Sequence, residues 1–175
     1  MSEDLKYPIG RVQFMPALTP ADRRDLINAI AAVPKDLRQA VAGLTEAQLD
    51  TPYRPDGWTI RQVVHHLPDS HMNAFIRLKL ALTEEAPTIK PYKEALWANL
   101  PDARLPIDVS LRLTEALHER WVAIMNTMAD NAWSRTFIHP ESGRNFTLDE
   151  MTQLYAWHGR HHVAHITELR KRSGW

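Results

Sequence analysis

The sequence of 175 residues contains no cysteine, and this absence excludes several kinds of site. Without thiolates the chain has no disulfide framework, no cysteine-ligated zinc or iron–sulfur site, and no cysteine nucleophile. Any metal site must therefore be built from nitrogen and oxygen ligands. Glycine is also scarce, with six residues, and no glycine-rich phosphate loop is present.

Neither sign of charge is in excess, since 21 Lys and Arg balance 21 Asp and Glu. The chain thus lacks the basic surplus that draws a protein to nucleic acid or to an anionic membrane, and we expect neither as a partner. No stretch approaches the ~20 apolar residues that span a bilayer, and the first residues lack the pattern of a signal peptide. We expect a single domain over residues 1–175, located in the cytoplasm.

Four stretches show the apolar periodicity of amphipathic helices. The first begins at the N-cap Thr19 and ends near Gly43, and the second begins at a capping box at Thr59. The third covers about residues 108–129, and the fourth begins at another capping box at Thr147. Four such helices favour an all-α four-helix bundle.

The connections between these helices are informative. Residues 84–107 contain four prolines and are too long for a simple up-down-up-down bundle, so we expect a crossover that leaves the second and third helices parallel. Residues 136–146 predict a small β-hairpin that turns at Ser142-Gly143. Pro34 and Pro68 fall inside expected helices, where each removes a backbone hydrogen bond and is expected to produce a kink.

Nine histidines are the most conspicuous feature of the chain, and four of them lie close together in the last helix. On a helical wheel His158 and His162 fall within ~30° of the centre of the apolar stripe, one turn apart. Imidazoles at i and i+4 can reach one metal ion, although core histidines bonded to neighbours are the competing interpretation. His161 and His165 form a second such pair. However, the helical wheel places His161 toward solvent, which favours the interpretation that this pair is part of the polar flank of the helix.

A catalytic metal usually has three protein ligands, and the second helix offers His65, His66 and His71. On an ideal wheel His71 lies nearest the apolar stripe, and His66 lies ~120° away. Pro68 interrupts the hydrogen-bond ladder between them, so the phase of the wheel does not carry across it. Periodicity alone leaves the third ligand undecided.

Several motifs agree in order and spacing with a known family. They include Tyr7-Pro8-Ile9-Gly10, Thr51-Pro52-Tyr53-Arg54, Gly57-Trp58-Thr59, Arg61-Gln62-Val63-Val64-His65-His66, Asp69-Ser70-His71-Met72-Asn73, Trp157-His158 and Ala164-His165-Ile166. Through these motifs nearly the whole chain resembles the YfiT-like branch of the DinB-like superfamily of metal-dependent hydrolases. The resemblance implies a bundle of up-down-down-up order with the long crossover between its second and third helices.

The resemblance also implies one divalent ion per chain, zinc or nickel, held by His66, His158 and His162. It further implies an enzyme that transfers a low-molecular-weight thiol, such as bacillithiol, to an electrophile, and a homodimer. Hydrolysis by a metal-activated water and a non-catalytic metal-binding bundle are the alternatives. Because the chain has no cysteine, the reactive sulfur of a transferase would come from a cosubstrate. Asp69 and Glu168 are candidate outer partners of the imidazoles, although solvated helix charges are the more ordinary interpretation of both.

Overall fold

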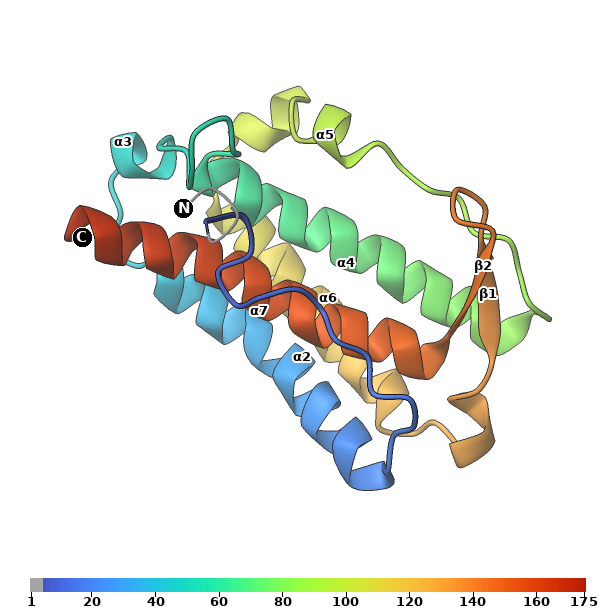
Figure 1. The fold of residues 1–175 in the computed structure, drawn as a ribbon. Helices are drawn as coiled ribbons and strands as arrows, with labels where there is room; N and C mark the ends of the chain where they lie inside the picture. Colours follow the sequence, from blue (N-terminus) through green and yellow to red (C-terminus); the bar gives the residue numbers. More distant parts are fainter. Residues whose placement is uncertain (1–4) are drawn as a thin grey trace.

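Four long helices form the body of the computed structural model, which describes residues 5–175. They are α2 (Pro20–Val41), α4 (Ile60–Thr83), α6 (Asp108–Met125) and α7 (Leu148–Ser173). In Figure 1, α2 and α7 run in one direction and α4 and α6 in the other. Helix α2 packs on α7 and α6, and α4 packs on the same two helices. The predicted up-down-down-up bundle with parallel second and third helices is confirmed.

Short elements join the long helices. They are α3 (Glu46–Leu49), α5 (Glu94–Trp97), the 3-10 turns η1 (Pro101–Arg104) and η2 (Asp130–Ala132), and the strands β1 (Thr136–His139) and β2 (Arg144–Thr147). The crossover returns along the length of α4 to the start of α6 (Figure 1), and it bridges to the hairpin between Thr88 and Ile138. The strands pair antiparallel with Phe137 opposite Phe146, which confirms the predicted hairpin.

Threonine caps determine where three of the long helices begin. Thr19, Thr59 and Thr147 each accept a hydrogen bond from a backbone N–H in the first turn, and the side chain three residues later reaches back to the cap. The third helix begins as predicted but ends at Met125, before the expected 129. There Thr127 bonds to carbonyl oxygens of the last turn, the local pairing by which such residues compete with helix.

Both internal prolines lie inside continuous helices, Pro34 in α2 and Pro68 in α4. A proline has no N–H, so the carbonyl four residues earlier loses its helical donor without the helix having to end. These carbonyls belong to Ile30 and Val64.

Two apolar clusters fill the space between the helices, one toward each end of the bundle. Trp121, Leu78 and Met151 belong to one cluster, and Leu37 and Ile166 belong to the other. On α4 and α7 several histidines fall between the two clusters, so polar side chains cross the middle of the core. No helix within the described part of the chain is long and apolar enough to cross a membrane.

Helices α2 and α7 pack very closely at Gly159. A Cβ atom at this position would lie 2.4 Å from Cγ2 of Val33, which is buried and, being β-branched, has little rotamer freedom. The contact occurs one residue after His158. The absence of a side chain at Gly159 therefore sets how deeply this part of α7 lies against α2.

We expect Gly159→Ala to lower the free energy of unfolding by up to ~2 kcal/mol. Overpacking against Val33 costs ~1–3 kcal/mol, and the better helix propensity of alanine returns only ~1 kcal/mol. Denaturant unfolding measures the change. In a Val33→Ala background the same substitution should be neutral or stabilising, and an equal loss in both backgrounds would contradict the steric explanation.

Candidate metal centre

Three histidine side chains from two helices converge in the middle of the bundle. They are His66 of α4 and His158 and His162 of α7, and one ring nitrogen of each lies within 4.8 Å of the other two. The Nε2 atoms of His158 and His162 are 3.2 Å apart. The ring of His66 lies 5.5 and 4.8 Å, centroid to centroid, from these two rings. The structure thus brings together the three residues that the resemblance implies.

The donor set fits a single divalent ion. Two nitrogens bound to a tetrahedral zinc ion at ~2.05 Å lie about 3.3 Å apart, close to the separation between His158 and His162. Three imidazole nitrogens suit zinc and nickel better than calcium or magnesium. Within residues 5–175, no other group of three His, Asp or Glu side chains has this proximity.

Burial keeps these three imidazoles neutral. Removal from water lowers the pKa of His66 to about 4. Burial, and to a smaller extent the neighbouring imidazoles, lower the pKa values of His158 and His162 well below the usual value. A neutral imidazole offers a lone pair to a metal, whereas a protonated one does not. The triad is therefore in the ligand form at neutral pH.

The triad lines a cavity of about 390 Å³. Aromatic rings of Tyr53, Trp58 and Trp157 form part of its wall, and the Trp58 ring lies 4.5 Å from the ring of His66. Arg54 also lines the cavity. A small molecule that entered this cavity would meet the three histidines.

His65, the neighbour of His66, has a structural role instead. Its Nδ1 is 2.7 Å from Oγ of Ser110, and its Nε2 is 3.0 Å from the carbonyl oxygen of Leu105. Because a carbonyl can only accept, Nε2 carries the proton and Nδ1 accepts from the serine hydroxyl. His65 therefore ties α4 to the crossover and to α6, which leaves His66 as the ligand candidate of the pair.

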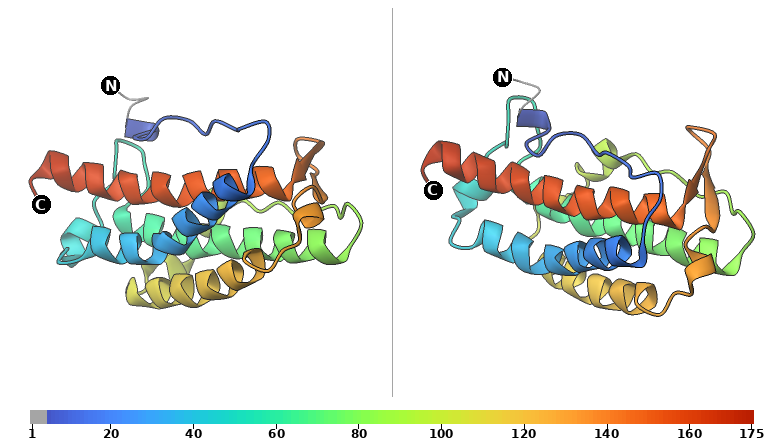
Figure 2. Two further views of the ribbon diagram at one scale, coloured as in Figure 1. Left: turned by 90° about the horizontal axis from the view of Figure 1, so that it is seen from below. Right: turned by 60° about the horizontal axis from the view of Figure 1, so that its bottom comes forward.

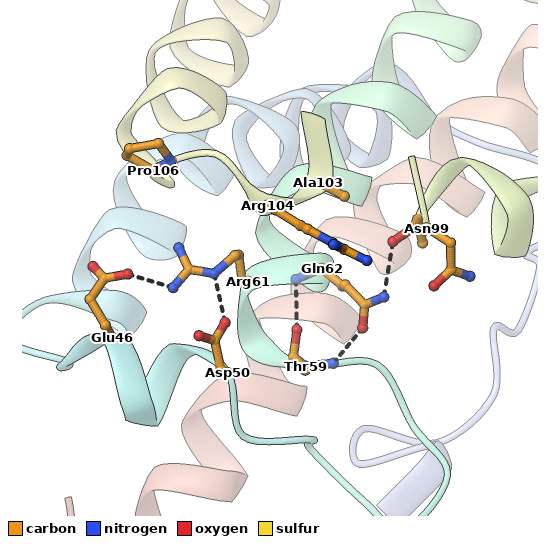
Figure 3. A pocket seen from close by; sticks show the side chains of 10 residues that line it. Glu46, Asp50, Thr59, Arg61, Gln62, Asn99, Ala103, Arg104 and Pro106 are labelled. Carbon is orange, nitrogen blue, oxygen red and sulfur yellow. Dashed lines mark hydrogen bonds and ion pairs between the residues drawn. The ribbon is translucent and has the colours of Figure 1, made fainter. Parts of the chain in front are cut away.

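Arg61 anchors the same end of α4. Figure 3 shows Glu46 and Asp50 directed at its guanidinium, with Nε 2.7 Å from the Asp50 carboxylate, while Gln62 donates to the carbonyl of Ala98. These residues line a cavity of about 590 Å³. Among residues 5–175, none of the buried side-chain atoms that lack a hydrogen-bond partner belongs to the wall of this cavity. The polar groups of the wall are thus already used, and they hold the crossover in place.

The prediction that His161 faces solvent is wrong. Its side chain is 7% exposed, and its ring stacks on Trp157 with centroids 4.3 Å apart. The segment of residues 5–18 lies along α7 and covers this face (Figure 2), where Trp157 donates to the Gly10 carbonyl and His165 to the Lys6 carbonyl. A wheel drawn for one helix contains no information about a segment from the other end of the chain.

His71 lies close to the triad but outside it. It is fully buried, as the wheel predicts, and its Nε2 is 3.1 Å from Nδ1 of His158. This imidazole, rather than Asp69 or Glu168, is the outer hydrogen-bond partner of His158. Neither carboxylate bonds to a ligand imidazole within the described residues.

His118 is a further buried histidine, beside His71. Searching the sequence for pairs of histidines does not identify it, because it is the only histidine in its helix. Its Nε2 is 2.8 Å from Nδ1 of His71. Its position seven residues after Leu111 and three before Trp121 places it on the apolar stripe of α6. That stripe is the sequence signal that could have found it.

Known proteins resemble this chain along nearly its whole length. Residues 29–166 match the family model of the DinB superfamily. A protein of Bacillus cereus (strain 03BB102) with the name "Putative metal-dependent hydrolase" is 54% identical over 172 residues, which cover 98% of this chain and 99% of that protein. A relative in Bacillus mycoides (strain KBAB4) is 52% identical over 173 residues, covering 99% of each.

A solved structure shares the fold closely. It is that of YfiT from Bacillus subtilis, described as "a probable metal-dependent hydrolase with an unusual four-helix bundle topology". Its TM-score is 0.96 at 47% identity, covering 98% of this chain and 99% of that one. The names of these relatives and the histidine triad together indicate a divalent metal. On the family match and these full-length relatives, the chain belongs to the DinB superfamily.

Proposed function

We propose that this protein is a metal-dependent enzyme in which His66, His158 and His162 hold one zinc or nickel ion and a low-molecular-weight thiol is transferred to an electrophile. The observation that carries the proposal is the convergence of three neutral imidazoles on one cavity. Three protein ligands leave a coordination position open, as in catalytic rather than structural zinc sites. A divalent ion in this position lowers the pKa of a bound thiol or water, which supplies a nucleophile near neutral pH.

Other residues of the cavity have roles that follow from their chemistry. The carboxylates of Asp56 and Glu94 line it and can accept the proton that the nucleophile loses. The ring of Trp58 packs at a tilt against the ring of His66 and contributes to its burial. The absence of cysteine means that a reacting sulfur would arrive on a small molecule. Hydrolysis by an activated water is the alternative that the relatives' names favour.

A second cavity of about 490 Å³ shares His158 and Glu94 with the first. Three buried atoms of residues in its wall have no hydrogen-bond partner, namely Arg77 Nε, Tyr92 Oη and His139 Nδ1. Of the four other such atoms in residues 5–175, three belong to histidines of the first cavity. An unpaired buried polar group costs ~1–3 kcal/mol. A ligand that spans both cavities would supply the missing bonds.

Arg77 gives the second cavity the character of an anion subsite. None of the ion pairs among the described residues involves it. Burial raises the pKa of Tyr155, and the nearby Arg77 guanidinium offsets part of that rise. Burial raises the pKa of Tyr92, so its hydroxyl remains a donor. A guanidinium fork beside a hydroxyl donor suits a carboxylate.

The remaining charges of this wall favour a single negative charge on the ligand. Lys93 adds a second cation to Arg77, and Glu94 and Glu141 add two anions, so the four charges cancel. A phosphate dianion would need a basic surplus that the wall lacks. We therefore assign the carboxylate of a small organic acid to the second cavity and its reacting end to the metal site.

Metal analysis of protein purified without an affinity tag tests the metal site. We expect about one equivalent of zinc or nickel per chain, removable by a chelator and restored on addition of either ion. Less than about one-tenth of an equivalent, with no uptake of added Zn²⁺ or Ni²⁺, would exclude every metal-dependent function.

Consumption of a thiol with monochlorobimane as the electrophile separates transfer from hydrolysis. We expect metal-dependent adduct formation with a panel of low-molecular-weight thiols, and its loss in His158→Ala because one of three ligands is removed. An equal rate in His158→Ala would contradict the proposed site. Metal uptake without any metal-dependent turnover would identify a non-catalytic metal-binding bundle.

A further inference from the structure

A chain of hydrogen bonds crosses the bundle from His158 to the opposite helix. The Nδ1 atom of His158 is 3.1 Å from Nε2 of His71, Nδ1 of His71 is 2.8 Å from Nε2 of His118, and Nδ1 of His118 is 2.7 Å from the carbonyl oxygen of Ile30. These residues belong to α7, α4, α6 and α2, so every long helix contributes one. His71 and His118 are 0% and 2% exposed, which keeps competing water away.

The last acceptor determines where the proton lies on each ring. The Ile30 carbonyl can only accept, so Nδ1 of His118 carries a proton. Burial disfavours the charged ring, so Nε2 of His118 is a lone pair that accepts from Nδ1–H of His71. In the same way, Nε2 of His71 accepts from Nδ1–H of His158. The lone pair of His158 is therefore on Nε2, the atom that faces Nε2 of His162.

Pro34 explains why the Ile30 carbonyl is free to end the chain. In a regular helix the N–H of residue 34 would donate to the carbonyl of residue 30, but proline has no N–H. Helix α2 continues through Pro34, so this carbonyl stays inside the bundle without a helical donor. His118 supplies the missing hydrogen bond. A proline that is unfavourable for helix formation thus creates a buried acceptor.

We propose that His71 and His118 are positioning residues of the metal site, and that they hold the His158 ring in one orientation and one tautomer with Nε2 presented to the ion. This inference rests on the proposed function. Metal-bound histidines generally donate their second ring N–H to an acceptor that fixes ring orientation. Here the acceptor is a neutral imidazole, which introduces no buried negative charge, and its own orientation is fixed in turn from α2.

A pair of substitutions at His118 tests the proposal. Leucine has a similar size but neither donates nor accepts, whereas the glutamine amide can accept from His71 and donate to the Ile30 carbonyl at once. We expect His118→Leu to weaken zinc binding ~10–100-fold in competition with a chromophoric chelator. His118→Gln should restore most of the loss. Zinc binding by folded His118→Leu at the wild-type affinity would overturn the proposal.

The tautomer of His158 gives a readout that needs no metal. In metal-free protein carrying ¹⁵N-histidine, we expect NMR to show the Nδ1–H form of His158 in the wild type and a mixture of tautomers in His118→Leu. An Nε2–H form in the wild type would refute the proposed proton order. Failure of the wild type to bind zinc would refute the proposed function instead, because this spectrum is recorded without the ion.

Pro34→Ala tests the same chain without changing a histidine, and it serves if His118→Leu does not fold. Alanine restores the helical N–H, which competes with His118 for the Ile30 carbonyl. We expect a helix at least as stable as before but zinc binding weakened ~10-fold. The control is Lys35→Ala, an exposed position in the same helix, which should leave zinc binding unchanged. Equal zinc affinity in Pro34→Ala and this control would contradict the proposed anchor.

Discussion

Replacing His66 with alanine is expected to abolish tight metal binding while the bundle remains folded. The loss of a ligand should exceed the ~10–100-fold that follows when only an outer partner is removed, so we expect zinc affinity to fall by more than ~100-fold. The metal-free protein should unfold at nearly the same denaturant concentration as the wild type. The reason is that His66 ring contacts involve Trp58 and the other two ligands rather than hydrogen bonds that tie helices together.

His65→Ala is the matched control, and the opposite result is expected. This change leaves the Ser110 hydroxyl without its partner, at ~1–3 kcal/mol. It also removes the shorter of two hydrogen bonds to the Leu105 carbonyl, at ~0.5–1.5 kcal/mol, because that carbonyl keeps only the 3.4 Å bond from Arg61. We therefore expect the free energy of unfolding to fall by ~2–4 kcal/mol and the zinc affinity of the folded protein to change little. Loss of zinc binding in His65→Ala with normal binding in His66→Ala would reverse the assignment of the two neighbours.

The bundle itself could be predicted from local signals. Thr19, Thr59 and Thr147 fix helix starts through contacts within three residues, and apolar periodicity identifies the face that each helix buries. The proline-rich crossover then limits the order of the helices. These features lie close together in the sequence, so they need no knowledge of the tertiary structure.

The metal site could be predicted only in part, because its members lie on different helices. His158 and His162 share one helix, so their common face follows from their spacing. The position of His66 depends on the rotation of α4 against α7, which periodicity does not contain. The role of His118 depends on all four helices, since its partners are His71 and a carbonyl of α2.

Arg77 and the carboxylate subsite are expected to make the protein prefer a thiol that carries a carboxylate over a neutral thiol. Mercaptoacetate and mercaptoethanol are thiols of similar size, but only the first carries a carboxylate. We expect the protein to bind mercaptoacetate at least ~10-fold more tightly, since a hydrogen bond to a charged group contributes ~1.5–3 kcal/mol. Ligand-observed NMR under anaerobic conditions measures both affinities, with and without bound metal.

Arg77→Gln is expected to remove this preference by weakening mercaptoacetate binding alone. Lys79→Gln removes one positive charge from an exposed position of the same helix, so it controls for the change in net charge. Tyr92→Phe should weaken mercaptoacetate binding ~2–10-fold through the loss of one neutral hydrogen bond. A preference that persists in Arg77→Gln would exclude the subsite. A preference that disappears with the metal would show that the carboxylate binds the ion itself, because Arg77 attracts a carboxylate whether or not the ion is present.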